Sequence, residues 1–315
     1  MKNLLERFKE PNWMQDHMIE YSDWREVPTE RLGRIKEGLA RFTSSEPLVT
    51  ICIPVWNEAD NLLKTLSSLS AIDLPYPTEL LFVNNNSTDE TVDILESMGL
   101  RVVHQPKQGI AHARLMGLQE SRGVYSLCGD GDTIYPTNWI KPIVTPLMKS
   151  AAVKCVYGFH AYAPTGNGSR IPWACYELAS FGATLMRKFK REFLNVHGCN
   201  FAFRTVEGLH VKGFEMALTR TFDSDRHQSD HVVFGEDGRM GRKLGELGKL
   251  KLVTDFSAVA WTSARRLLRE DGTMFKAFTS RAKLELSLMG TYLFGPAKVP
   301  NTSDDITTSA TSISK

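Results

Sequence analysis

Short apolar runs alternate with amphipathic stretches between residues 49 and 130. The run VTICIPV (49–55) is apolar throughout, as in strands that are buried on both faces of a sheet. The next stretch, NEADNLLKTLSSL (57–69), carries leucines at helical spacing. The same alternation predicts three more strands, at 79–85, 101–105 and 123–130. It also predicts two more helices, at 87–98 and 109–121. It therefore predicts an α/β fold with a doubly wound, mostly parallel sheet that has helices on both faces.

Two helix starts are predicted from capping residues. Asn57 stands where the N-cap of the first helix would be. Ser87 and Glu90 have the spacing of a capping box, in which each side chain bonds the backbone N–H of the other residue.

The pattern divides the chain into four parts. Residues 1–47 form a polar extension with helical spacing and mixed charges, which favours packing against the main domain over lying on a membrane surface. The regular alternation fills residues 48–150. Residues 151–298 are less regular and contain a long predicted helix at 172–193, and the tail 299–315 is poor in hydrophobic residues and predicted to be disordered.

Composition excludes several classes of protein. The 315 residues carry 38 basic and 36 acidic side chains, and the formal charge of +2 requires no nucleic-acid partner. Five widely spaced cysteines without a Cys-x-x-Cys pair indicate neither a disulfide framework nor a zinc site. The lack of a signal peptide and of a run of about 20 apolar residues favours a cytoplasmic protein.

The cluster MRKFKR (186–191) is typical of a solvated helix face, but it also suits peripheral association with anionic lipid at the inner membrane face, or a phosphate-bearing acceptor.

Polar residues stand at the predicted ends of the strands, where ligands of such sheets bind. In SLCGDGDTIYP (126–136), Asp130 and Asp132 flank Gly131 just where an apolar run stops. Two carboxylates in one crevice repel each other unless a cation lies between them and another ligand, and oxygen ligands favour Mg²⁺ or Mn²⁺. Taken alone, the motif is equally typical of a plain Asp-Gly-Asp turn.

The stretch from about residue 49 to 140 resembles the family 2 glycosyltransferases, which are inverting enzymes of the GT-A fold. The similarity lies in motifs that follow one another in the family's order, namely IPVWNEADNL, FVNNNSTDET and GIAHARLMGLQESRGVYSLCGDGDTIYPTNWI. The resemblance implies a Rossmann-like GT-A domain with a mixed, mostly parallel sheet. It also implies a nucleoside-diphosphate sugar as donor and Mn²⁺ or Mg²⁺ as cofactor.

The resemblance assigns roles to residues of the first half. Asp130 and Asp132 form its Asp-x-Asp motif, with Asp132 as the more direct metal ligand and Asp130 nearer the ribose or the metal's water shell. Arg114 pairs with Asp130 or a phosphate, or is a structural cation. Where the family commonly has an aspartate facing the base, this chain has Asn84, whose amide can still bond uracil, so a UDP-linked donor is expected. The nucleotide pocket is implied to include Pro54, Asn57, Glu58, Asn84, Asn85 and Gly131.

The second half is implied to hold the catalytic base. VVFGEDGRMGRKL (232–244) is similar to the family's Glu-Asp segment, which implies Asp237 as the base for the acceptor hydroxyl and Glu236 in a supporting role. Carboxylates at a helix start are also ordinary capping. Arg265 and Arg266 either hold the diphosphate or form a solvated basic turn.

The loop DSDRHQSDH (223–231) carries His227 and His231 at helical spacing among aspartates. A zinc site would need a third ligand, and none is marked. A mobile loop on the acceptor side is therefore the favoured interpretation.

The predicted function is a single-addition, metal-assisted, inverting glycosyltransferase for a glycan or lipid-linked acceptor in surface glycan or glycolipid synthesis. Processive synthases of the family carry a Gln-x-x-Arg-Trp motif and transmembrane helices, which this sequence lacks. A sugar nucleotidyltransferase is the first alternative, but it would need a glycine-rich basic loop after the first strand. The second alternative is a non-catalytic nucleotide-sugar-binding homologue, for which Asn84 is the hint.

Overall fold

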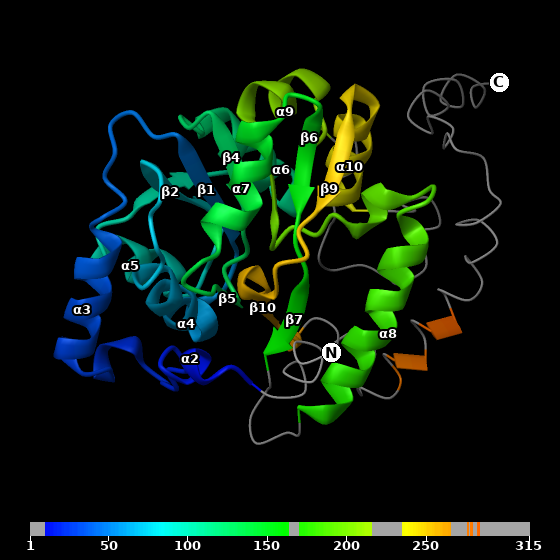
Figure 1. Cartoon of the computed structure of the whole chain (residues 1–315). Coiled ribbons are helices and arrows are strands. Elements are labelled where there is room, and N and C mark those ends of the chain that lie inside the picture. Colours follow the sequence, from blue (N-terminus) through cyan, green and yellow to red (C-terminus); the bar gives the residue numbers. More distant parts are fainter. Residues whose placement is uncertain are drawn as a thin grey trace, which may run out of the picture.

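A seven-stranded mixed sheet forms the centre of the protein (Figure 1). The computed structural model describes residues 10–163, 170–215 and 235–265, with residues 276, 278, 279, 282 and 283. The strands of this sheet follow the order β3-β2-β1-β4-β8-β6-β9. They are β1 (Val49–Val55), β2 (Thr78–Asn84), β3 (Arg101–His104), β4 (Tyr125–Cys128), β6 (Val153–Tyr157), β8 (Phe201–Arg204) and β9 (Lys249–Leu252).

The first four strands are parallel. β1 pairs with β2 and β4, and β2 pairs with β3, so their carboxyl ends meet at one edge of the sheet. β8 runs antiparallel to both β4 and β6. The four strands predicted from the alternation are confirmed, and the sheet is mixed and mostly parallel as expected.

A small second sheet lies beside this edge and was not predicted. It has the order β5-β10-β7, with β5 (Thr133–Ile134), β10 (Ala260–Ser263) and β7 (His160–Ala163). Because β5 directly follows Asp132, its pairing with β10 holds the Asp130–Asp132 turn against a strand from the far end of the chain. The backbone N–H of Ser263 also donates to the carbonyl of Asp132 at 3.1 Å.

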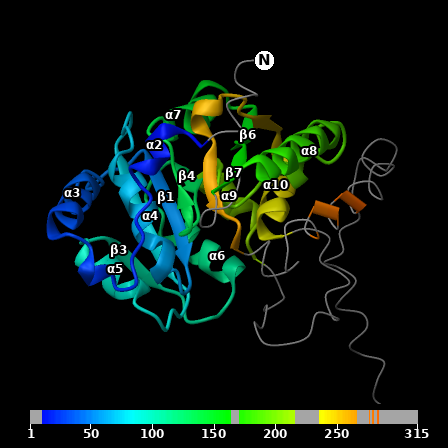
Figure 2. The same ribbon diagram turned by 90° about the horizontal axis from the view of Figure 1, so that it is seen from below.

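Helices cover both faces of the large sheet, as the alternation predicts. Side chains of β1 alternate between them: Ile51 and Ile53 pack with the helices of one face, and Cys52 packs with Ala113 on the other. Figure 2 shows α6 and α7 on opposite sides of the sheet. The first face carries α3 (Thr29–Leu39), α4 (Ala59–Ser70), α5 (Thr91–Ser97) and α7 (Ile140–Lys149). The second carries α6 (Ile110–Glu120), α9 (Thr205–Val211) and α10 (Glu236–Leu247).

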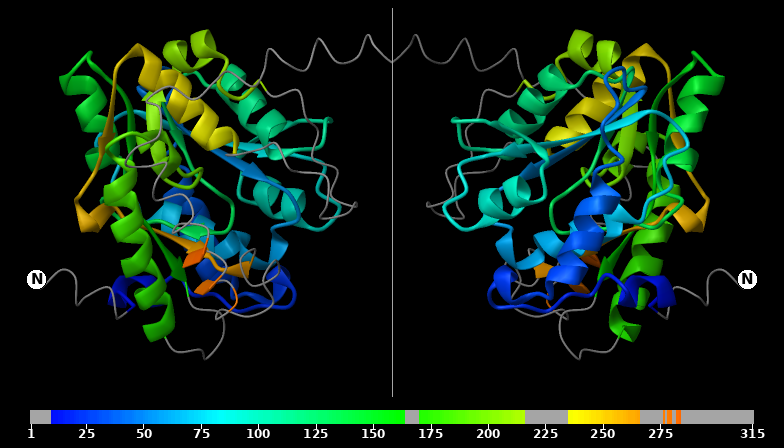
Figure 3. Two further views of the ribbon diagram at one scale, coloured as in Figure 1. Left: turned by 90° about the vertical axis from the view of Figure 1, so that its right-hand side faces the viewer. Right: turned by 90° about the vertical axis from the view of Figure 1, so that its left-hand side faces the viewer.

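The long predicted helix is present as α8 (Ile171–Arg187), which lies at the outer end of the molecule (Figure 3). It packs on β7 and on the short helix η3 (Glu192–Asn195). No helix within the described ranges is long and apolar enough to cross a membrane.

The N-terminal stretch packs on this core. Met14, in α2 (Asn12–Gln15), is fully buried in the core cluster that also contains Ile134 of β5 and Trp261 of β10, and Ile35 of α3 joins the core beside α4. Residues 1–9 and the predicted disordered tail 299–315 lie outside the described residues. The predicted domain boundaries stay predictions.

Both predicted caps are wrong, because Asp89 bonds the first N–H of both helices, that of Ala59 in α4 and that of Thr91 in α5. α4 begins at Ala59, whose N–H is bonded by the carboxylate of Asp89 at 3.0 Å. Asn57 has a positive φ of 51° and accepts a bond from Thr88 N–H at 2.8 Å. α5 begins only at Thr91, and the Ser87 hydroxyl accepts from Asn57 N–H at 3.1 Å.

Candidate active site

The Asp130-Gly131-Asp132 turn lies at the carboxyl edge and is packed against the end of β1. A Cβ atom on Gly131 would come within 2.8 Å of Val55 Cγ1, so only glycine lets the turn approach this closely. The carbonyl of Gly131 accepts from the Thr65 hydroxyl at 2.8 Å. Pro54 is buried within β1 and lies behind the turn. The turn is therefore fixed by the core rather than by a ligand.

The two aspartates have different surroundings. The Asp132 side chain is 9% exposed, and its Oδ2 lies 3.8 Å from Arg265 Nη2. The Asp130 side chain is 29% exposed and accepts from Arg114 Nη2 at 2.6 Å. The Tyr135 hydroxyl lies beneath Asp130 and bonds its backbone N–H at 2.7 Å.

Arg114 is buried and joins the two halves of the site. Its side chain is 2% exposed and donates from Nη2 to Asp130 and from Nε to Glu236, the latter at 3.3 Å. Because a buried guanidinium without anionic partners would be costly, the two carboxylates hold it in place. Gly198 makes room for it, since a Cβ there would lie 2.2 Å from Arg114 Nη2.

Glu236 and Asp237 stand in the first turn of α10. Asp237 accepts two backbone N–H bonds, from Gly238 at 2.7 Å and from Gly198 at 3.0 Å. Burial raises the pKa of Asp237 even though these two bonds and Arg114 act in the opposite direction. Burial, and then the charge of Asp237, raise the pKa of Glu236. The carboxyl groups of Asp130, Glu236 and Asp237 thus lie around the single guanidinium of Arg114. Their surroundings favour a proton on Glu236 or Asp237.

Glu58 and Arg265 form a second ion pair at this edge. Nη2 of Arg265 lies 2.7 Å from both oxygens of Glu58, whose side chain is 7% exposed. Arg265 is therefore turned into the edge, toward both Glu58 and Asp132. Arg266, His227 and His231 lie outside the described residues.

The asparagines after β2 are engaged by the protein itself. Asn84 accepts from Ser87 N–H at 2.9 Å, and its Nδ2 lies 3.1 Å from His104 Nδ1. Asn85 donates to the carbonyls of residues 105 and 107 and accepts from Gly109 N–H at 2.7 Å. Asn85 therefore holds the loop that starts α6, the helix that carries Arg114.

A pocket of about 200 Å³ lies between α8 and the segment from β6 to β7. The rings of His160 and His197 meet edge to face in it, with centroids 4.6 Å apart. His197 immediately precedes Gly198, whose N–H holds Asp237. The pocket also has aromatic walls from Phe159, Tyr162, Tyr176 and Phe181. The two histidines were not predicted from the sequence.

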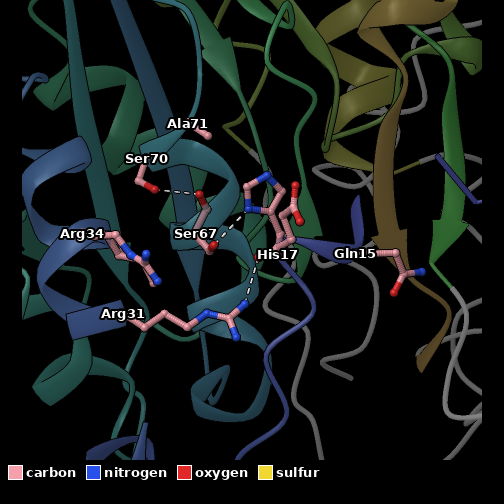
Figure 4. A pocket seen from close by; sticks show the side chains of 9 residues that line it. Gln15, His17, Arg31, Arg34, Ser67, Ser70 and Ala71 are labelled. Atoms are coloured by element: carbon pink, nitrogen blue, oxygen red, sulfur yellow. Dashed lines mark hydrogen bonds between the residues drawn. The ribbon is translucent and has the colours of Figure 1, made fainter. Parts of the chain in front are cut away.

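A larger hollow of about 570 Å³ lies between the N-terminal stretch and α4 (Figure 4). His17 Nδ1 lies 2.9 Å from the Ser67 hydroxyl, and Arg31 donates to the carbonyl of Asp16 at 2.8 Å. None of the residues predicted for the site lines this hollow. The chemistry therefore belongs to the carboxyl edge.

Within the described part of the chain, no group of three or more His, Cys, Asp or Glu side chains is arranged to hold a metal. Asp130 and Asp132 offer two carboxylates at the mouth of the site. An ion such as Mn²⁺ or Mg²⁺ would need its other ligands from water or a bound phosphate, which is common for magnesium sites. The residues present fit such an ion.

Comparisons with known proteins agree with this geometry. Residues 50–206, about half of the chain, match the family model described as glycosyl transferase family 2. Over 107 residues the chain is 31% identical to glycosyltransferase AglE of Haloferax volcanii, a match that covers 32% of this chain and 35% of AglE. Over 136 residues it is 30% identical to the dolichol-phosphate mannosyltransferase of Saccharomyces cerevisiae, covering 40% of this chain and 49% of that one. The chain thus spans less than half of either relative.

The fold has a solved counterpart. The crystal structure of Staphylococcus aureus TarS superposes with a TM-score of 0.51 at 14% identity, covering 77% of this chain and 43% of TarS. The sheet, its helices and this similarity establish the GT-A fold.

We predict that Gly198→Ala lowers the free energy of unfolding by about 1–3 kcal/mol, because the new methyl group displaces a guanidinium that is held by two carboxylates. The matched control is Gly182→Ala on the exposed side of α8, where a Cβ meets nothing within 4 Å. That control should gain about 0.5–1 kcal/mol from helix propensity. Equal effects of the two variants in urea unfolding would contradict the role of Gly198.

We predict that Glu236→Gln gains stability relative to the native protein as the pH rises from 4 to 7. The raised pKa means that the folded protein keeps a proton that the unfolded chain has released, so the native carboxyl costs stability as the pH rises through this interval. Urea unfolding at several pH values measures the difference. Glu246→Gln, at an exposed position of the same helix, is the control. A difference in unfolding free energy between Glu236→Gln and the native protein that stays constant as the pH rises, or that falls, would contradict the prediction.

Proposed function

Because this chain belongs to glycosyltransferase family 2, we propose that it transfers a sugar from a nucleoside diphosphate to an acceptor hydroxyl with inversion at the anomeric carbon. The donor we propose is UDP-linked. One observation carries the proposal: buried Arg114 bonds Asp130 of the Asp-x-Asp turn and Glu236 beside Asp237. Arg114 thereby holds the residues proposed to act on the leaving group and those proposed to act on the acceptor hydroxyl in one site.

The leaving-group end consists of Asp130, Asp132 and Arg265. We propose that Asp132, with Asp130, holds Mn²⁺ or Mg²⁺, which when bound supplies a Lewis acid for the charge that develops on the departing diphosphate. Arg265 lies within 3.8 Å of Asp132 and contributes a cation on the same side. An arginine fork is well suited to phosphate oxygens.

The base end is Asp237. Inversion requires a base that takes the proton of the acceptor hydroxyl on the face opposite the leaving group. The backbone N–H bonds from Gly198 and Gly238 fix the direction of its carboxylate. Burial raises its pKa, which makes the carboxylate a stronger base than an exposed aspartate. Glu236 supports it through Arg114.

The nucleoside would lie over the ends of β1 and β2, near Pro54, Asn57, Glu58, Asn84, Asn85 and Gly131. Asn57 and Asn85 shape the loops there through their own hydrogen bonds. At the position where the family commonly has an aspartate, buried Asn84 bonds His104, whose imidazole is exposed. We propose that this pair accepts the base.

The acceptor would enter on the side of His160 and His197. Aromatic walls suit the apolar faces of a sugar ring, and His197 of this pocket precedes Gly198, whose N–H bonds Asp237. We propose a glycan or lipid-linked acceptor in surface glycan or glycolipid synthesis. The yeast relative, whose name specifies dolichol phosphate, supports the lipid-linked form.

We predict that Mn²⁺ together with the correct nucleoside-diphosphate sugar stabilises the protein. A donor at about 100 times its dissociation constant should add roughly 2.7 kcal/mol. Thermal unfolding with UDP-, GDP- and dTDP-sugars, with and without Mn²⁺, measures this. Asp132→Asn should lose the metal-dependent part, whereas Asp93→Asn on the exposed side of α5 should keep it. No response to any donor would overturn the proposed donor site.

We predict that Asp237→Asn keeps donor binding but lowers the rate of sugar transfer by about 10²–10⁴-fold, the usual contribution of a general base. Transfer to a panel of acceptors, with product anomers assigned by NMR, measures both the rate and the stereochemical outcome. Glu246→Gln on the same helix is the matched control and should transfer normally. Unchanged transfer by Asp237→Asn would assign the base elsewhere, and a product that retains the donor's configuration would contradict inversion.

A further inference from the structure

One face of α8 exposes an unusual set of residues. Ile171 is 59% exposed, Leu178 39%, Leu185 45% and Phe189, just past the helix, 77%. Cys175 and Gly182 fill the positions between them and are exposed as well. The spacings of 4, 3, 4, 3 and 4 residues place all six on one line along the helix. We call this line the α8 stripe.

The opposite face of α8 is fully used by the fold. Trp173, Tyr176 and Glu177 are buried, and Glu177 accepts from the backbone N–H of Tyr162 in β7 at 2.7 Å. The helix is thus held by its inner face. Large apolar side chains gathered on one exposed line indicate a binding surface rather than scattered surface residues.

The exposed charged residues of the described stretch 171–190 have one sign. The exposed residues between 171 and 190 include Lys188 and Lys190 but no aspartate or glutamate. The two arginines of the same cluster, Arg187 and Arg191, are buried, so MRKFKR is not simply a solvated face. The lysines flank Phe189, the most exposed of the large hydrophobic side chains of the described residues.

We propose that the α8 stripe binds the surface of an anionic lipid bilayer. The apolar side chains would enter the boundary between headgroups and acyl chains, and Lys188 and Lys190 would lie among the lipid phosphates. A second copy of the chain is a poorer match, because pairing two stripes brings no acidic group to the lysines. Figures 1 and 3 show α8 along the outer end of the molecule.

This orientation has a consequence for the acceptor. The inner face of α8 lines the pocket that contains His160 and His197. A bilayer on the outer face would thus lie one helix diameter, about 10 Å, from that pocket. Substrates that are anchored in the bilayer would then enter from the side of this pocket.

The test measures vesicle binding and needs no enzymatic activity, so it is independent of the proposed function. The full-length protein is sedimented with vesicles of phosphatidylcholine containing one quarter phosphatidylglycerol, and with vesicles of phosphatidylcholine alone. We expect clear binding to the first, weaker binding to the second, and loss of binding at high salt.

Substitutions in the stripe sharpen the test. Lys188→Ala with Lys190→Ala should weaken binding by about 30-fold, at about fivefold for each lysine. Leu185→Ser with Phe189→Ser should weaken it by at least tenfold on both kinds of vesicle. The matched controls are Lys249→Ala with Lys251→Ala, at exposed positions of β9, and Val206→Ser, which is 70% exposed on α9. The controls should bind like the native protein.

Three results would overturn the proposal. The first is the absence of binding to anionic vesicles, and the second is binding that the stripe variants leave unchanged. The third is a native dimer in analytical ultracentrifugation that the Leu185 and Phe189 variants convert to a monomer, which would make the α8 stripe an interface between copies. Thermal unfolding of each variant confirms that it is folded before binding is measured.

Discussion

The buried guanidinium of Arg114 connects the segments that meet at the carboxyl edge of the large sheet. Arg114 is carried by α6, and it bonds Asp130 from the turn after β4 and Glu236 from the start of α10. Its charge is shielded from water, so each of these segments must stay close enough to neutralise it. A mixed sheet alone would not fix α10 relative to the Asp130–Asp132 turn. The ion pairs to Arg114 do, and Gly198 is the residue that leaves space for them.

Around Arg114, the loops at the carboxyl edge are held in place by contacts with other segments of the protein. The ends of β1 and β2 exchange hydrogen bonds through Asn57, Thr88 and Asp89, and Asn85 bonds the loop before α6. β10 holds the Asp130–Asp132 turn from the other side. The candidate site is thus preorganised by short polar contacts between segments that are distant in sequence. Such preorganisation is the main way in which a protein stabilises charge that develops during a reaction.

The sequence predicts some of this structure well and some of it not at all, for physical reasons. The strands β1, β2 and β4 consist of consecutive buried residues, so an apolar run marks each of them in the sequence. The predicted caps of α4 and α5 were wrong because Asp89 bonds the first N–H of both helices: it reaches Ala59 from a loop that is distant in sequence, which no local pattern reveals, and it takes Thr91 in place of Ser87. β5 and β7 are short strands completed by β10, far away in sequence, and they left no periodic signal. The candidate site residues came from the family resemblance and from carboxylates at strand ends, and the structure brings Arg114, Asp130 and Glu236 together, whereas His160 and His197 look ordinary in the sequence.

The way in which Asp237 is held affects how such a protein can diversify. Its two oxygens are bonded by the backbone N–H groups of Gly198 and Gly238, not by side chains. The neighbouring His197 side chain points away into the pocket. Substitutions at His160 or His197 can therefore reshape the pocket while the alignment of the carboxylate is inherited from the main chain. Under the proposed function, selection can therefore alter the acceptor pocket at these two positions while the main chain keeps the orientation of Asp237.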